Sequence, residues 1–112
     1  MALAFMGAEV IKVERPDVAS SQAQLNRFVM NSNKKSITLD LHKPEGQRLL
    51  RELAATADVL IENMRPGTLE RWGLGYDDLA AVNPRLVMIR VTGFGQDGPY
   101  PSQPGYGWTG EA

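Results

Sequence analysis

Three glycines near the end of the chain, Gly93, Gly95 and Gly98, have the spacing of a dinucleotide-binding loop. In such a loop the backbone approaches a pyrophosphate, and a helix opens at the third glycine so that its N-terminus faces the anion. Here three of the six residues after Gly98 are prolines, which cannot sustain a helix interior. We therefore expect no NAD site, although the loop itself stays a candidate for part of a ligand site.

Cations form the second group of residues that could do chemistry. Arg15, the Lys34–Lys35 pair and the His42–Lys43 pair each lie where a strand is expected to begin or end. A solvated surface charge is the usual explanation for each of them. Several cations converging at one edge of a sheet would nevertheless suit a polyanionic ligand such as a nucleotide phosphate. The only histidine, His42, is more typical of a structural or exposed residue than of a catalytic one.

The turn from Asn63 to Gly67 leaves one expected strand and enters an expected helix. Two interpretations stay open: a plain strand-to-helix turn, or helix N-terminal amides that bind an anion or a carbonyl group. The acidic residues form no metal-ligand pattern, and the serines lack a nucleophile-elbow motif. The residues of this chain therefore indicate ligand binding without a complete catalytic set.

An alternation of strands and helices must hold these residues. Apolar, β-branched runs predict strands at 7–14, 36–41, 58–63 and 86–91. Helical spacing and capping signals predict helices at 44–57, 66–72 and 76–82. The alternation predicts parallel crossovers and hence an α/β fold with an open sheet, in which ligands bind beyond the carboxyl ends of the strands. The 58–63 strand is apolar enough in its middle to be buried on both faces.

Composition excludes several classes of protein. The 112 residues are enough for one domain, and the 43% hydrophobic and 22% charged residues are typical of a globular chain. A net charge of −1 argues against a nucleic-acid-binding surface. No apolar run approaches the length of a membrane span, and the absence of cysteine excludes disulfides and thiolate metal sites. We expect a cytoplasmic protein.

Seven motifs along the chain occur together in a known order. They are Gly7–Glu14, Asn33–Leu41, Pro44–Gly46, Ala57–Gly67, Leu74–Tyr76, Asn83–Leu86 and Gly93–Tyr100. This arrangement closely resembles the class III CoA-transferase family (CaiB/BaiF type), which includes formyl-CoA transferase, the carnitine CoA-transferases and α-methylacyl-CoA racemase. The resemblance covers nearly the whole chain.

The resemblance implies a fold, substrates and partners. It implies a partial Rossmann-like, mainly parallel sheet with flanking helices that binds coenzyme A or an acyl-CoA as substrate, with no NAD and no metal. It also implies a carboxylic acid as second substrate and an interlocked homodimer. Transferases of this family move CoA between carboxylic acids through an aspartyl-CoA thioester, a form of nucleophilic catalysis.

The resemblance also assigns CoA contacts position by position. Arg15 matches a residue that contacts the nucleotide, and Leu39–His42 matches the stretch around the adenine and its phosphates. Asn63–Arg65 matches the loop beside the CoA chain, Arg71 another CoA-binding arginine, and Pro104–Gly107 the segment bordering the thioester. The implied CoA-binding residues are therefore Arg15, Leu39, Asp40, Leu41, His42, Asn63, Met64, Arg65, Arg71, Pro104, Gly105, Tyr106 and Gly107.

The sequence departs from the family in three places. His42 stands where the family usually has lysine, and Lys43 is the neighbouring cation that could take over a phosphate contact. The polar loop at 17–32 is shorter than usual. The first strand of the domain and the region of the catalytic aspartate find no match within 1–112, so we expect this chain to be a fragment of the large domain. We place no catalytic residue within it and expect the nucleophilic aspartate after Ala112.

Tyr106 separates the two branches of the family. The racemase branch carries a histidine there as an acid/base group, and tyrosine, with an ordinary pKa of about 10, is poorly suited to that role near neutral pH. This favours a transferase, inactive as the isolated fragment. The alternatives are an acyl-CoA racemase or epimerase, and a non-catalytic truncated domain that binds CoA or self-associates.

Overall fold

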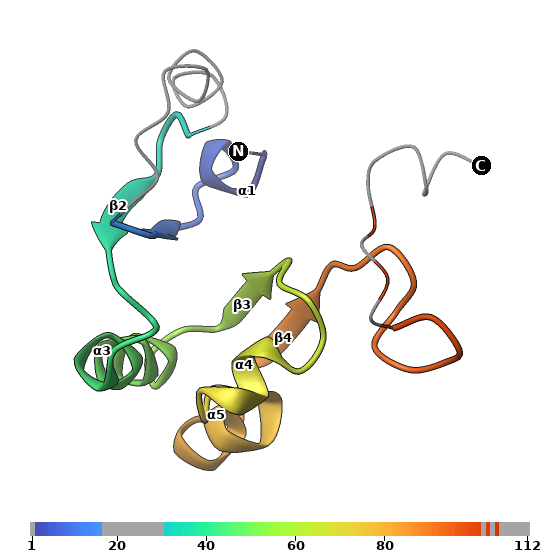
Figure 1. Ribbon diagram of the computed structural model, residues 1–112. Coiled ribbons are helices and arrows are strands. Elements are labelled where there is room, and N and C mark those ends of the chain that lie inside the picture. Colours follow the sequence, from blue (N-terminus) through green and yellow to red (C-terminus); the bar gives the residue numbers. More distant parts are fainter. Residues whose placement is uncertain (1, 17–30, 102, 104, 106–112) are drawn as a thin grey trace. The chain divides into compact units, whose positions relative to one another are not determined.

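The computed structural model describes residues 2–16, 31–101, 103 and 105 (Figure 1). The chain divides into two compact units, Met1–Gly46 and Gln47–Ala112. Each unit holds one pair of parallel strands. The fold is therefore α/β with short parallel strands and flanking helices, as the alternation in the sequence predicts.

The first unit contains a short helix and two strands. Helix α1 (Ala2–Phe5) precedes β1 (Ile11–Glu14), which pairs in parallel with β2 (Lys35–Thr38). Backbone hydrogen bonds extend the ladder at both ends, from the Lys35 N–H to the Val10 carbonyl at 2.8 Å and from the Leu39 N–H to the Glu14 carbonyl at 2.9 Å. The small core consists of Ala4, Leu39 and Leu41.

The second unit alternates helices and strands. Helix α3 (Pro44–Ala54) spans the boundary between the units and begins at Pro44, where a missing N–H costs nothing. It is followed by β3 (Val59–Glu62), α4 (Thr68–Arg71), α5 (Tyr76–Val82) and β4 (Val87–Arg90). Strands β3 and β4 run parallel, as Figure 1 shows. No helix in the described ranges is long and apolar enough to cross a bilayer.

Leucines and one asparagine hold the helices of the second unit. Its buried hydrophobic residues are Leu50, Ala54, Leu69, Leu74, Leu79 and Leu86. The Asn83 side chain, just after α5, donates from Nδ2 to the carbonyl oxygens of Ala54 at 3.0 Å and Ala57 at 2.7 Å. Ala54 is the last residue of α3, and its carbonyl also accepts from the N–H of Ala57, which lies just beyond the helix, at 3.3 Å. Asn83 therefore both caps α3 and joins it to α5.

Three expectations about the strands are wrong. The strand expected at 7–14 begins only at Ile11. The strand expected at 36–41 ends at Thr38, because Asp40 begins a tight turn. The strand expected to be buried on both faces has one exposed face: Val59 and Ile61 pair in register with Val87 and Ile89, and all four side chains are between 45% and 56% exposed. We call these four residues the β3–β4 apolar face. An apolar run alone cannot tell one covered face from two.

Gly46 allows α3 to approach the turn that precedes it. A Cβ atom at this buried position would overlap the carbonyl oxygen of Asp40, which is backbone and cannot rotate away. We expect Gly46→Ala to lower the free energy of unfolding by about 1–3 kcal/mol, as overpacking does. Chemical denaturation measures this. Glu45→Ala, at the exposed neighbouring position, should cost under about 0.5 kcal/mol; equal costs for both would contradict the steric explanation.

Candidate functional site

The first group of predicted ligand residues lies at the carboxyl edge of the β1–β2 pair. Arg15 directly follows β1 and Leu39 directly follows β2, and parallel strands place both at the same edge. The Arg15 and His42 side chains are exposed, whereas Leu39 and Leu41 are each only 6% exposed. A ligand at this edge would meet the side chains of Arg15 and His42, and only the main chain of the two leucines.

Asp40 gives this edge its shape. Its Oδ1 accepts from the His42 N–H at 3.1 Å and lies 3.2 Å from His42 Nδ1, and its Oδ2 lies 3.9 Å from Lys43 Nζ. Its main-chain carbonyl accepts from the Lys43 N–H at 3.1 Å. An aspartate side chain that accepts from the main-chain N–H two residues later, as Asp40 does from His42, is typical of turns. The turn therefore brings His42 and Lys43, the two cations considered for a phosphate contact, to one carboxylate.

The second group lies at the carboxyl edge of the β3–β4 pair. Asn63–Arg65 follows β3, and the chain after β4 leads to Gly93 at the same edge. Asn63 and Arg65 are exposed and Met64 is half-buried. Arg71 is also exposed, and its Nη2 donates to Thr68 Oγ1 at 3.2 Å. Each group thus lies at the edge of a sheet where α/β folds bind ligands.

An ion network that the sequence did not reveal supports the second edge. Arg90, the last residue of β4, donates from Nε to Glu62 Oε1 at 2.6 Å and from Nη1 to Glu70 Oε1 at 2.5 Å. The other oxygen of Glu62, Oε2, accepts from the Met64 N–H at 2.7 Å. We call Glu62, Glu70 and Arg90 the Arg90 network. It links β3, β4 and α4 and reaches the Asn63–Arg65 turn.

Burial and charge distinguish the members of the network. The side chains are 6% exposed for Glu62, 16% for Arg90 and 45% for Glu70. The hydrogen bond from Arg90 lowers the pKa of Glu70, and the bond to Glu70, with a further contribution from Glu62, raises the pKa of Arg90. Among the described residues, no three His, Asp or Glu side chains are grouped to hold a metal ion.

The glycine-rich loop has a structural explanation for its first glycine. A Cβ atom on Gly93 would overlap the main chain of Gly105, and one on Gly105 would overlap Gly93, so two backbones cross here. Gly95 and Gly98 have φ angles of 81° and 112°, which side chains disfavour. No helix opens between 93 and 101, as the prolines predict. Pro104, Tyr106 and Gly107 lie outside the described residues.

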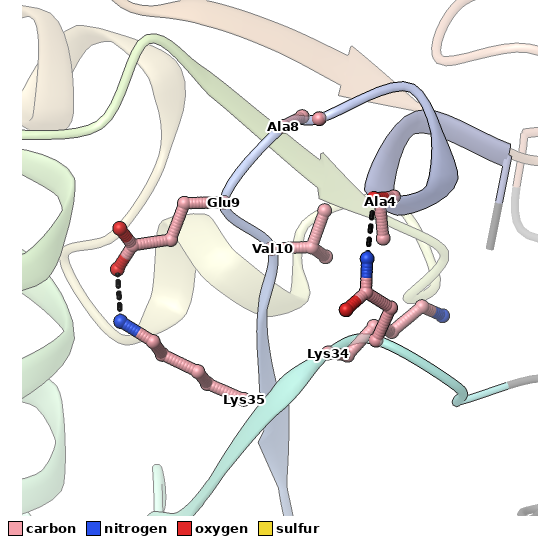
Figure 2. Close-up of a pocket in the computed structure, with 8 residues that line it drawn as sticks. Ala4, Ala8, Glu9, Val10, Lys34 and Lys35 are labelled. Atoms are coloured by element: carbon pink, nitrogen blue, oxygen red, sulfur yellow. Dashed lines mark hydrogen bonds and ion pairs between the residues drawn. The ribbon is translucent and has the colours of Figure 1, made fainter.

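A pocket of about 370 Å³ opens at the opposite edge of the first sheet (Figure 2). Its lining comes from the residues before β1 and those at the start of β2, and includes the Glu9–Lys35 ion pair at 2.7 Å. The Asn33 side chain, which also lines the pocket, donates from Nδ2 to the Ala4 carbonyl at 2.7 Å. The pocket lies at the amino ends of β1 and β2, whereas the predicted CoA residues Arg15 and Leu39–His42 follow the carboxyl ends of these strands.

The sequence matches the model of CoA-transferase family III over residues 1–112. The chain therefore belongs to this family, in agreement with the resemblance found from its motifs. It is 51% identical, over 98% of its length, to succinyl-CoA–D-citramalate CoA-transferase of Chloroflexus aurantiacus. It is 49% identical, over 89% of its length, to the beta subunit of succinyl-CoA–L-malate CoA-transferase of the same organism. The chain spans 30% and 27% of these two relatives.

Part of a solved structure has the same fold as this chain. The crystal structure of Rv3272 from M. tuberculosis superposes with a TM-score of 0.82 at 46% sequence identity. The match covers 92% of this chain and 29% of that protein.

The Arg90 network predicts a pH dependence of stability. The pKa of Glu70 in the folded protein is below its ordinary value of 4.5, so its contribution is present above that value and is lost as the pH falls through the folded pKa. We expect Glu70→Gln to destabilise the protein at about pH 7 and to cost progressively less as the pH falls through the lowered pKa of Glu70, because the wild-type carboxylate takes up its proton there. Chemical denaturation at neutral pH and at a series of acidic pH values measures this. A pH-independent difference would mean that the charge of Glu70 contributes nothing.

The crossing of Gly93 and Gly105 predicts a localised effect of alanine. Gly93→Ala should force the two backbones apart and speed amide hydrogen exchange and proteolysis between 93 and 105 by roughly tenfold or more, because overpacking costs about 1–3 kcal/mol. Gly95→Asn is the control, since asparagine tolerates a left-handed φ and a Cβ there meets only an ordinary 3.7 Å contact. Unchanged exchange in Gly93→Ala would show that the crossing is not tight.

Proposed function

We propose that the complete protein containing this chain transfers CoA between carboxylic acids through an aspartyl-CoA thioester. The observation that carries this proposal is the family match over residues 1–112, together with relatives named as transferases at 51% and 49% identity. Those relatives are named for succinyl-CoA with D-citramalate or L-malate. We therefore propose succinyl-CoA as the donor and a short dicarboxylic acid as the acceptor.

We propose that the residues matched to the CoA contacts of the family bind CoA. Arg15 and Leu39–His42 would contact the nucleotide, and Asn63–Arg65 with Arg71 would contact the rest of the CoA chain. The exposure of Arg15, Arg65 and Arg71, and the position of both groups at carboxyl edges of parallel strands, support this. Arginine suits phosphate because its fork of N–H donors is planar and permanently charged. Pro104–Gly107 would border the thioester.

The remaining parts of the proposal rest on the family resemblance. Residues 1–112 would form part of the CoA-binding large domain of a cytoplasmic, interlocked homodimer, and the nucleophilic aspartate would lie beyond Ala112. Because the nucleophile would be absent from these 112 residues, they should be inactive alone. A racemase is not favoured, since the two relatives above are named as transferases.

The test is turnover by the complete protein, with mass spectrometry of the CoA thioesters formed from succinyl-CoA and either D-citramalate or L-malate. Arg65→Gln should raise KM for the CoA donor by about tenfold, since a hydrogen bond to a charged group is worth about 1.5–3 kcal/mol. It should change kcat less. Arg85→Gln is the matched control, because Arg85 is exposed but precedes β4, at the opposite edge of the same sheet.

Two outcomes would contradict the proposal. Exchange of the α-proton of a branched acyl-CoA for deuterium, without transfer to an acid, would identify a racemase. Failure of the complete protein to bind CoA in calorimetry would leave only a scaffold role for this domain.

A further inference from the structure

Glu62 is the one buried charged residue among those the structure describes. Its two carboxylate oxygens have different partners: Oε1 accepts from Arg90 Nε at 2.6 Å, and Oε2 accepts from the Met64 N–H at 2.7 Å. One oxygen thus belongs to the ion network between the strands. The other reaches forward along the chain to the turn that follows β3.

The bond to Met64 fixes more than one atom. The peptide group is planar, so an anchored Met64 N–H also sets the direction of the Asn63 carbonyl. The next residue along the chain is Arg65, which is exposed and without regular secondary structure. At the other end of this turn, the Arg65 carbonyl accepts from the Thr68 N–H at 3.1 Å, which ties Arg65 to the start of α4. The bond to Glu62 holds the part of the turn next to β3, where Asn63 and Met64 lie.

A purely structural explanation of Glu62 accounts for only half of these contacts. Neutralising Arg90 needs a nearby carboxylate, and Glu70 already accepts from both terminal nitrogens of Arg90, at 2.5 and 3.3 Å. Burying a second carboxylate costs solvation that an ion pair does not generally repay. The contact that Glu70 does not duplicate is the one to the Met64 N–H. This contact points toward the predicted ligand turn.

We propose that Glu62 is a positioning residue, which holds the Asn63–Arg65 turn in the conformation that receives a CoA thioester. Arg90 keeps the Glu62 carboxylate in place. The carboxylate in turn holds the Met64 N–H and so fixes the conformation of the turn. The inference rests on the proposed function, because it takes the CoA thioester as the ligand of this turn. Glu62 touches no reacting atom in this proposal; it acts through Met64 and its neighbours.

The test compares three glutamate-to-glutamine variants of the complete protein. Glu62→Gln presents an N–H to either Arg90 or Met64, so one donor loses its acceptor. We expect KM for succinyl-CoA and the Kd for CoA to rise roughly tenfold, since a hydrogen bond to a charged group is worth about that factor. The kcat and the KM for the acid acceptor should change less than threefold. Met64 amide exchange should quicken by roughly tenfold.

The other two variants separate positioning from stability. Glu70→Gln weakens the network at α4 and leaves the bond between Glu62 and the Met64 N–H in place, so it should lower stability yet leave KM for the CoA donor within about twofold. Glu52→Gln makes the same chemical change at an exposed residue of α3 that pairs with Arg48. It should change neither the stability nor the KM for the CoA donor. Glu62→Asp keeps the charge but is one methylene shorter, so positioning predicts a raised KM for the CoA donor here as well.

Several results would overturn the inference. It is wrong if Glu62→Gln and Glu62→Asp bind CoA as the wild type does, or if Glu70→Gln raises KM as much as Glu62→Gln, since either would leave Glu62 a purely structural role. Failure of the wild-type protein to bind CoA would instead overturn the proposed function. In that case Met64 exchange still decides whether Glu62 orders the turn, because this measurement needs no ligand.

Discussion

The second unit depends on one guanidinium group held between two carboxylates. Arg90 binds Glu62 through Nε and Glu70 through its terminal nitrogens, so one rigid fork joins β4 to β3 and to α4. A lysine could not reproduce this, because its ammonium is a single point of charge on a flexible stem. The network also fixes the strand register: a slip of one residue would turn Arg90 to the opposite face, away from Glu62.

The elements that the sequence predicted are those with local causes. Pro44 begins α3, and Tyr76–Val82 forms a helix with the expected bounds, because initiating and terminating residues act within one turn of chain. Burial of β3 was predicted wrongly, since the exposure of Val59 and Ile61 depends on what lies over that face. The Glu62–Arg90 pair was within reach of sequence reasoning, because each residue ends an apolar run and parallel pairing aligns them. The bond from Arg90 to Glu70 and the bond from the Met64 N–H to Glu62 could not be predicted, because they depend on the geometry of the loop after β3.

The glycines show why a motif needs its structural context. Gly93, Gly95 and Gly98 match a dinucleotide pattern, yet the physical reason for Gly93 is its contact with the main chain of Gly105. Gly46 must likewise lack a side chain, because the main chain of Asp40 occupies the space that a Cβ atom would need. In both places the sequence shows that a side chain is missing but not which segment occupies the space. Family membership and the structure together, rather than the pattern alone, separate a CoA-transferase domain from a nicotinamide-binding one.

The crossing of Gly93 and Gly105 also bears on how members of such a family can diverge. The close approach of the Gly93 and Gly105 main chains closes the segment between them into a loop. Closure entropy grows only with the logarithm of loop size, so doubling such a loop costs about 0.6 kcal/mol. Insertions, deletions and substitutions between the two glycines can therefore accumulate while the sheet stays unchanged.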